Sequence, residues 1–131
     1  MKFGFYSPEI GGATVREVFA RAKEWGFSTM QYDFSTSHGD TVPAVITDES
    51  VAEIAAAAKE FGMQIEAING TLNMIDVNKE RREENLRRFP QIAKAAKALD
   101  CRIITLCTGS RNPESGWRYH PDSLLPVHGR R

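Results

Sequence analysis

The chain has 131 residues, of which 41% are hydrophobic and 26% charged, so it has the size and composition of one folded domain rather than of a disordered chain. Lysine plus arginine and aspartate plus glutamate both number 17, so no basic excess indicates a nucleic-acid or anionic-membrane partner. No apolar run is long enough for a signal peptide or a bilayer span, so we expect a cytoplasmic protein with no membrane partner.

The N-terminal segment predicts a strand over 2–7 followed by a helix over 14–25. Thr14 and Glu17 have the spacing of a capping box, in which a hydroxyl and a carboxylate satisfy free amides at a helix start. Gly26 is placed to end this helix, because glycine readily adopts the left-handed conformation common at helix C-termini.

This strand–helix unit repeats along the chain. Further strands are predicted over 28–34, 63–69 and 101–108, and further helices over 48–61 and 79–99. Each predicted strand is a short run with β-branched or aromatic residues, and each helix has apolar residues at helical spacing. The residues expected to face the core are Val15, Val18, Phe19, Ala22 and Trp25 in the first helix, Val51, Ile54, Ala55, Ala58 and Phe61 in the second, and Leu86, Phe89, Ala93, Ala96 and Leu99 in the third.

Three helix ends set the period of the repeat. Gly26, Gly62 and Asp100 each separate a predicted helix from the next strand, and they lie 36 and 38 residues apart. Strands that alternate with helices indicate parallel pairing and right-handed crossovers. A complete (β/α)8 barrel needs about 250 residues.

We therefore predict an α/β fold made of four β/α units of a TIM (β/α)8 barrel, a half-barrel with parallel strands, over residues 1–122. A doubly wound sheet of four strands is the alternative, although no G-x-G-x-x-G phosphate motif follows the first strand. Residues 123–131 are predicted to form an irregular tail without a helical stripe long enough to cover the last strand. Such a tail would be explained by a truncated or frame-shifted reading frame, or by a protein that functions as a half-barrel.

Polar residues concentrate in the loops that follow the predicted strands, where the active sites of barrels lie. Asp33 and Asn69 occupy equivalent places in the repeat, seven residues after Gly26 and Gly62. Either they bind a polyol or a catalytic residue, or each side chain caps the loop that it opens.

The loop over 109–122 combines two arginines with a tryptophan, a tyrosine and a histidine. Aromatic faces suit the apolar faces of sugars, and guanidinium groups suit phosphate or carboxylate. The alternative is an ordered loop whose Trp117 covers the rim of the barrel.

No residue of the chain has a recognisable catalytic or metal-binding pattern. The His, Asp and Glu residues lack the short spacing of a local metal site, and no Ser or Cys lies in a nucleophile elbow. Cys101 and Cys107 would lie ~20 Å apart along a strand, too far for a disulfide.

Three segments after the third and fourth strands carry a family resemblance. Gly70–Ile75, Thr105–Pro113 and Trp117–Asp122 resemble the xylose isomerase-like sugar-phosphate isomerase/epimerase family, and the resemblance covers about residues 1–122. It implies a TIM barrel that binds a sugar or sugar phosphate and isomerises or epimerises it next to a carbonyl. It also implies a divalent metal, Mn, Co, Mg or Zn, in the complete barrel.

The resemblance also limits what this chain contributes. The metal ligands and the acid/base glutamates of the family lie mainly on strands five to eight, so we assign no catalytic residue, metal ligand or cofactor here. The residues that the resemblance implies for substrate binding are Asn73, Trp117, Arg118 and His120. We expect the chain alone to be inactive, and the sequence leaves the sugar and the metal open.

Two other functions compete with this one. A DNA-repair endonuclease of the same superfamily would place histidine ligands where this chain has Asn69-Gly70 and Cys107-Thr108. A non-catalytic assembly module would use the open sheet edges to form a homo-oligomer. The apolar residues expected on the exposed inner face are Phe3, Phe5, Met30, Tyr32, Ile65, Ala67, Ile103 and Thr105.

Overall fold

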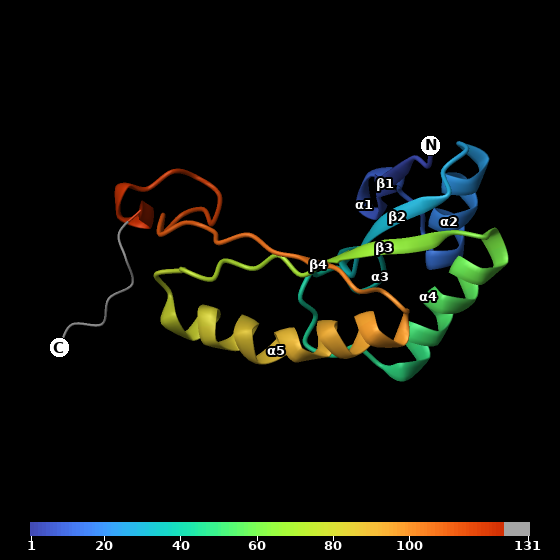
Figure 1. The fold of residues 1–131 in the computed structure, drawn as a ribbon. Coiled ribbons are helices and arrows are strands. Elements are labelled where there is room, and N and C mark those ends of the chain that lie inside the picture. Colours follow the sequence, from blue (N-terminus) through green and yellow to red (C-terminus); the bar gives the residue numbers. More distant parts are fainter. Residues whose placement is uncertain (125–131) are drawn as a thin grey trace.

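The computed structural model describes residues 1–124 and contains a sheet of four parallel strands in the order β1-β2-β3-β4. The strands are β1 (Gly4–Tyr6), β2 (Thr29–Asp33), β3 (Gln64–Asn69) and β4 (Ile104–Thr105) (Figure 1). Each strand pairs with its neighbour in sequence, as successive units of a (β/α) barrel do. This arrangement confirms the predicted α/β fold with parallel strands.

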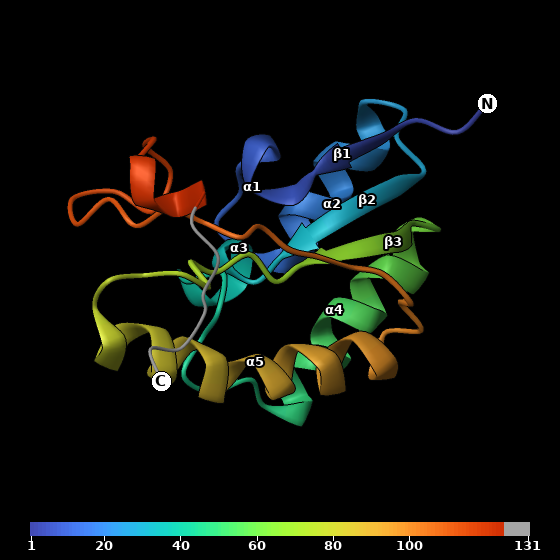
Figure 2. The same cartoon turned by 60° about the vertical axis from the view of Figure 1, so that its left-hand side comes forward.

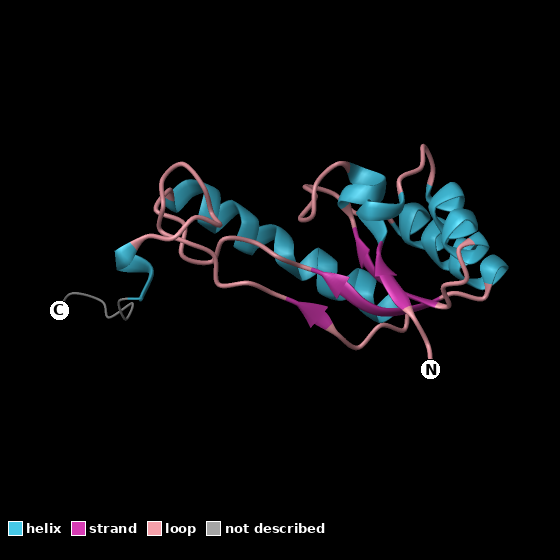
Figure 3. Ribbon diagram, turned by 90° about the horizontal axis from the view of Figure 1, so that it is seen from above, coloured by secondary structure: helices cyan, strands magenta, loops and turns pink. Residues whose placement is uncertain are grey.

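Three long helices cover one face of the sheet and leave the other open (Figure 3). They are α2 (Val15–Glu24), α4 (Asp48–Phe61) and α5 (Lys79–Ala98), close to the predicted ranges. The Thr14 hydroxyl accepts from the Glu17 amide at 3.2 Å, and the Glu17 carboxylate accepts in return from the amide of Ala13. The predicted cap therefore forms, with its return bond shifted one residue outward.

Short helical turns that the sequence pattern did not predict follow three of the strands. α1 (Ser7–Ile10) and α3 (Ser35–His38) come directly after β1 and β2, and the 3-10 helix η1 (Pro121–Leu124) ends the described segment. The Ser123 hydroxyl in η1 accepts from the Arg111 amide at 3.0 Å. η1 thus spans the predicted boundary at residue 122, and the rest of the predicted tail, 125–131, lies outside the described residues.

The three predicted helix ends share one geometry. Gly26, Gly62 and Asp100 have φ values of 84°, 60° and 52°, all in the left-handed region. The amide after each of them donates to a carbonyl five residues earlier, at 2.9–3.0 Å. This is the Schellman arrangement, and its repetition turns the chain from each helix into the next strand.

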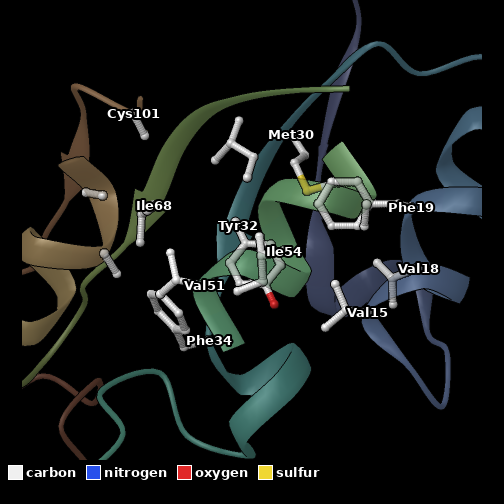
Figure 4. Close-up of a cluster of buried hydrophobic side chains, with 14 of the residues drawn as sticks. Val15, Val18, Phe19, Met30, Tyr32, Phe34, Val51, Ile54, Ile68 and Cys101 are labelled. Carbon is white, nitrogen blue, oxygen red and sulfur yellow. The ribbon is translucent and has the colours of Figure 1, made fainter. Parts of the chain in front are cut away.

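The core lies between the sheet and the helices (Figure 4). Tyr32 of β2 is fully buried, with its ring centroid 6.3 Å from that of Phe19 and 5.5 Å from that of Phe34. Val18 of α2 and Ile54 of α4 pack into the same cluster. These contacts fix both helices against β2.

The predicted helix stripes need four corrections, because Trp25, Ala55, Leu86 and Ala93 are exposed. Trp25 lies at the end of α2, where the chain already turns away from the core. In α5 the buried residues are Ile92, Ala95 and Ala96. The N-terminal half of this helix extends beyond the strands, so its apolar residues have no sheet to cover (Figure 1).

The expectation of an apolar open face is wrong for Met30, Tyr32 and Ile65, which are buried under the helices. A bulge at Glu66 shifts the register, since Met30 pairs with Ile65 but Gln31 pairs with Ala67. Both sides of a barrel strand usually carry apolar residues, so alternation alone could not assign the faces.

Self-association stays a prediction, and fewer exposed apolar residues and shorter sheet edges support it than the sequence suggested. β1 and β4 are the sheet edges, but they span only three and two residues, and short edges are poor templates for pairing. Phe3 and Ile103 remain exposed, at 59% and 54%. Within residues 1–124, no helix has both the length and the apolar character needed to cross a bilayer.

Candidate functional site

The four strands end in polar side chains that together form a hydrogen-bonded group, named here the strand-end cluster. Its members are Tyr6, Asp33, Asn69 and Thr105, each the last residue of its strand. Parallel pairing aligns these ends, because Asp33 pairs with Asn69 and Asn69 with Thr105 in the register of the sheet. The cluster therefore lies at the carboxyl edge of the sheet, where barrel enzymes bind substrate.

Asp33 is the centre of the cluster and is fully buried. Its Oδ2 accepts hydrogen bonds from the Tyr6 hydroxyl, from Asn69 Nδ2 at 2.7 Å and from the Thr41 hydroxyl at 3.2 Å. Its Oδ1 accepts from the Ser35 amide at 2.7 Å. A buried carboxylate with this many donors has its charge well compensated.

The same contacts set the protonation states in the cluster. Burial works to raise the pKa of the Asp33 carboxyl, but the hydrogen bonds from Tyr6, Ser35 and Asn69 outweigh it and hold the pKa below its ordinary value. Burial and the bond to Asp33 raise the pKa of Tyr6 to about 12. At neutral pH, Asp33 is thus an anion and Tyr6 a neutral donor, so neither is poised to exchange a proton.

Asn69 links the cluster to the last strand. Its Nδ2 donates to the Tyr6 oxygen at 2.9 Å as well as to Asp33, and its Oδ1 accepts from the Thr71 amide at 3.1 Å. The Thr105 hydroxyl donates to the same Oδ1 at 3.4 Å. Asp33 and Asn69 therefore cap the loops that they open, as one interpretation of the sequence proposed, and they also bind each other across the sheet.

Gln31 extends the cluster along the open face. Its Nε2 donates to the Thr105 hydroxyl at 2.7 Å, and its side chain is only half-buried. Among residues 1–124, its Oε1 has no hydrogen-bond partner. The amide can therefore still accept from, and donate to, a hydroxyl group placed on the open face.

Asn73 lies in a different place, between the loops that follow β3 and β4. Its Nδ2 donates to the Ser110 carbonyl at 2.7 Å, and its Oδ1 accepts from the Ser110 amide at 3.0 Å. A β-carbon on Gly109, where φ is 89°, would lie 2.0 Å from that Oδ1. Asn73 is buried and joins the two loops through a contact that needs glycine at position 109.

The other three predicted substrate residues lie in the loop over 109–124, named here the β4 loop. Trp117 is 64% exposed, and the exposed Arg118 side chain forms a 3.8 Å ion pair with Glu114. His120 is half-buried, and its Nδ1 accepts from the Asp122 amide at 3.2 Å. The structure thus separates these residues from the strand-end cluster, since the β4 loop extends beyond the sheet alongside the start of α5 (Figures 1 and 2).

Two of the four predicted residues line one hollow. Asn73 and Trp117 line a hollow of about 250 Å³ together with Asp76, Arg81 and Asn85. Whether any of the four binds substrate stays a prediction.

The arrangement of side chains in residues 1–124 does not suit a metal ion. No group of three or more His, Cys, Asp or Glu side chains in residues 1–124 could hold one. Both carboxylate oxygens of Asp33 are already occupied by protein donors. That the isolated chain binds no divalent metal tightly stays a prediction, to be checked by metal analysis after dialysis. Cys101 and Cys107 are both free thiols, as the sequence predicted.

Comparison with known proteins agrees with this arrangement. The profile of the family described as “Xylose isomerase-like TIM barrel” matches residues 19–124. The chain belongs to this family. Among curated proteins, none gives a significant sequence match.

Two solved structures of this family's fold are similar to the chain. The apo form of the 3-keto-D-glucoside 4-epimerase YcjR from E. coli matches with a TM-score of 0.67 and 22% identity, over 100% of this chain and 44% of the epimerase. A xylose isomerase-like TIM barrel/4-hydroxyphenylpyruvate dioxygenase fusion protein matches with a TM-score of 0.61 and 12% identity, over 86% of this chain and 17% of the fusion protein. At these identities the likeness shows the fold, and the chain spans less than half the length of the epimerase.

Sequence reasoning found part of the strand-end cluster and missed the rest. Asp33 and Asn69 occupy equivalent positions in the repeat, and this equivalence identified both as candidates. Tyr6 and Thr105 gave no such signal, because neither follows its predicted helix end at the same spacing. All four are the last residues of the observed strands, but three of the predicted strands extended one to three residues too far, so strand ends read from the sequence gave only Asn69.

Proposed function

We propose that this chain supplies the polyol-binding part of a sugar or sugar-phosphate isomerase/epimerase site. The observation that carries the proposal is the strand-end cluster, in which all four strands contribute a polar side chain to one hydrogen-bonded group. Family membership and the fold shared with a sugar epimerase support the same substrate class.

In this proposal the cluster binds and orients the sugar rather than moving its protons. The Asp33 carboxylate fixes the Tyr6 hydroxyl and the Asn69 amide, so these groups hold one geometry before substrate arrives. Gln31, with its unused Oε1, offers hydrogen bonds to a substrate hydroxyl. Preorganised polar groups of this kind position a substrate at low entropic cost.

The proton transfers and the metal chemistry of the family are proposed to come from residues outside the described part of this chain. The lowered pKa of Asp33 and the raised pKa of Tyr6 leave neither group near neutrality. The family resemblance implies acid, base and metal ligands mainly on strands five to eight, and this expectation supports the proposal. We accordingly propose that residues 1–124 alone bind sugar without turning it over.

The test uses two glutamines of the same sheet as a matched pair. Gln31 lies beside the strand-end cluster, and Gln64 lies at the amino end of β3, where it accepts from Lys2 at 3.2 Å. D-fructose and D-fructose 6-phosphate are titrated into ¹⁵N-labelled chain, and amide shifts of Gln31, Asn69 and Thr105 are followed by NMR. We expect saturable shifts that Gln31→Ala weakens and Gln64→Ala leaves unchanged. Shifts that respond equally to both variants, or no saturable shift at all, would contradict the proposal.

A further inference from the structure

A second hollow lies away from the strand-end cluster, between the loop after β3, the first turn of α5 and the β4 loop. It has a volume of about 340 Å³. Its lining residues are Met74, Ile75, Asp76, Val77, Arg82 and Arg111. No member of the strand-end cluster lines it, so its role is independent of the proposed polyol site.

The acidic residue in the lining is already neutralised. Asp76 is 4% exposed, and its carboxylate accepts from Arg81 Nε at 2.6 Å, from Arg81 Nη2 at 2.8 Å and from the Asn78 amide at 2.8 Å. The hydrogen bonds from Arg81 lower the pKa of Asp76, so the pair is a fixed ion pair at neutral pH. Asp76 therefore has no charge left over for a second arginine.

Arg82 and Arg111 are the two remaining charges of the lining. Arg82 donates through Nη1 to the backbone carbonyl of Asp76, which anchors one edge of its guanidinium. Within residues 1–124, no carboxylate forms an ion pair with Arg82 or Arg111, although both are half-buried. With Arg81 and Asp76 cancelling, the hollow carries a formal charge of about +2.

The two loops that bring these arginines together are joined by backbone contacts. The Met74 amide donates to the Thr108 carbonyl at 3.0 Å, one residue from the paired hydrogen bonds between Asn73 and Ser110. The Arg111 amide is held by the Ser123 hydroxyl. The backbone of Arg111 is thus held in place beside the hollow before any ligand is present.

We propose that this hollow binds the dianionic phosphate group of a small phosphorylated ligand, with Arg82 and Arg111 as its partners. Two guanidinium groups match a dianion in charge, and planar guanidinium forks hydrogen-bond phosphate oxygens in pairs. Met74 and Ile75 provide an apolar wall for the carbon part of the ligand. The volume lies at the lower end of the range for small-molecule pockets.

Isothermal titration calorimetry on the full chain at low salt tests the proposal. The probes are inorganic phosphate, D-glucose 6-phosphate, D-glucose and acetate. We expect the two phosphates to bind saturably and more tightly at pH 8 than at pH 5.5, because a phosphate monoester gains its second charge near pH ~6. Acetate should bind at least about tenfold more weakly, because it lacks the dianion. D-Glucose also lacks the dianion, so any binding of it at the strand-end cluster should not respond to Arg111→Gln.

Single substitutions separate the hollow from general surface charge. Arg111→Gln should weaken phosphate binding about tenfold, since it removes charged hydrogen bonds. Arg102→Gln is the matched control, because Arg102 is exposed and outside the hollow. Arg82→Gln should act like Arg111→Gln, and a thermal melt checks that it folds, because Arg82 also holds the Asp76 carbonyl. If Arg82→Gln unfolds, the phosphate affinity of Arg111→Gln alone decides whether the hollow binds phosphate.

Three results would overturn the proposal. The first is that the folded chain shows no saturable binding of either phosphate. The second is that Arg102→Gln weakens binding as much as Arg111→Gln, which would mean that phosphate responds to net charge alone. The third is binding of D-glucose 6-phosphate but not of inorganic phosphate, since the sugar and not the phosphate would then be recognised.

Discussion

The strand-end cluster and the β4 loop present polar groups at the same end of the fold in opposite ways. In the cluster, Asp33 is fully buried, and two of the side chains that donate to it, Tyr6 and Asn69, are also hydrogen-bonded to each other. In the β4 loop, Trp117 and Tyr119 are 64% and 75% exposed, and the ion pair of Arg118 is formed with its own loop.

This contrast shows that side chains at strand ends are held more firmly in this fold than side chains in a long loop. A residue at the end of a strand inherits its position from the register of the sheet, so four such residues can form one network. A residue in a long loop is positioned only by the anchors of that loop, here Asn73 and Ser110. The cluster should therefore contribute strongly to stability, and the exposed loop residues should contribute little.

The largest effect is expected for Asp33→Ala. This substitution leaves the Tyr6 hydroxyl, the Asn69 amide and the Ser35 N–H without their acceptor, and unsatisfied buried donors are costly. We expect the free energy of unfolding to fall by about 3 kcal/mol, measured by urea denaturation. Asp33→Asn keeps an acceptor and should cost less. Equal losses in both variants would show that the charge, and not the hydrogen bonding, stabilises the cluster.

A smaller loss is expected for Asn73→Ala, which removes the join between the two loops. The Ser110 amide and carbonyl both lose their partner in a buried position, so we expect a loss of about 2 kcal/mol. Hydrogen exchange at the Ser110 amide should accelerate. Asn112→Ala serves as the control, because within residues 1–124 the Asn112 side chain accepts from amides of its own turn and from no other group. If both variants behave alike, Asn73 does not anchor the loop.

Acid should weaken the strand-end cluster. The pKa of Asp33 is lowered in the folded state, so its contribution is complete above the ordinary aspartate pKa of about 3.9 and is lost as the pH falls through the folded value. We expect thermal stability to decline below about pH 4. Thermal stability should decline less steeply with pH in Asp33→Asn, because this variant lacks the Asp33 carboxyl while Asp76 and the other carboxyls still titrate. Parallel pH profiles for the two proteins would exclude Asp33 as the cause.

The smallest stability effect is expected for Trp117→Ala and Arg118→Ala. Both side chains are exposed, so each change should alter the free energy of unfolding by less than about 0.5 kcal/mol. If the loop lines the substrate site, the matching changes in a complete homologous barrel should weaken binding or turnover of sugar phosphates. Unchanged affinity and turnover there would remove Trp117 and Arg118 from the site.

Residue type and spacing predicted the three long helices of this fold because the interactions that begin and end them are local. The caps at Thr14 and Thr47, which accept from the Glu17 and Ser50 amides, form within one turn of helix. The helix ends at Gly26, Gly62 and Asp100 likewise depend on hydrogen bonds that span only five residues. Local patterns of this kind can be recognised from residue type and spacing alone.

The polar face of the sheet and the contacts between distant side chains became apparent only in the folded structure. The bulge at Glu66 set the register of β3 against β2, and no local pattern marks that position. The cluster joins Tyr6 to Asn69 and Gln31 to Thr105, pairs that are 63 and 74 residues apart. Such contacts arise only after the strands have aligned, because each side chain then gains its partner from a different β/α unit.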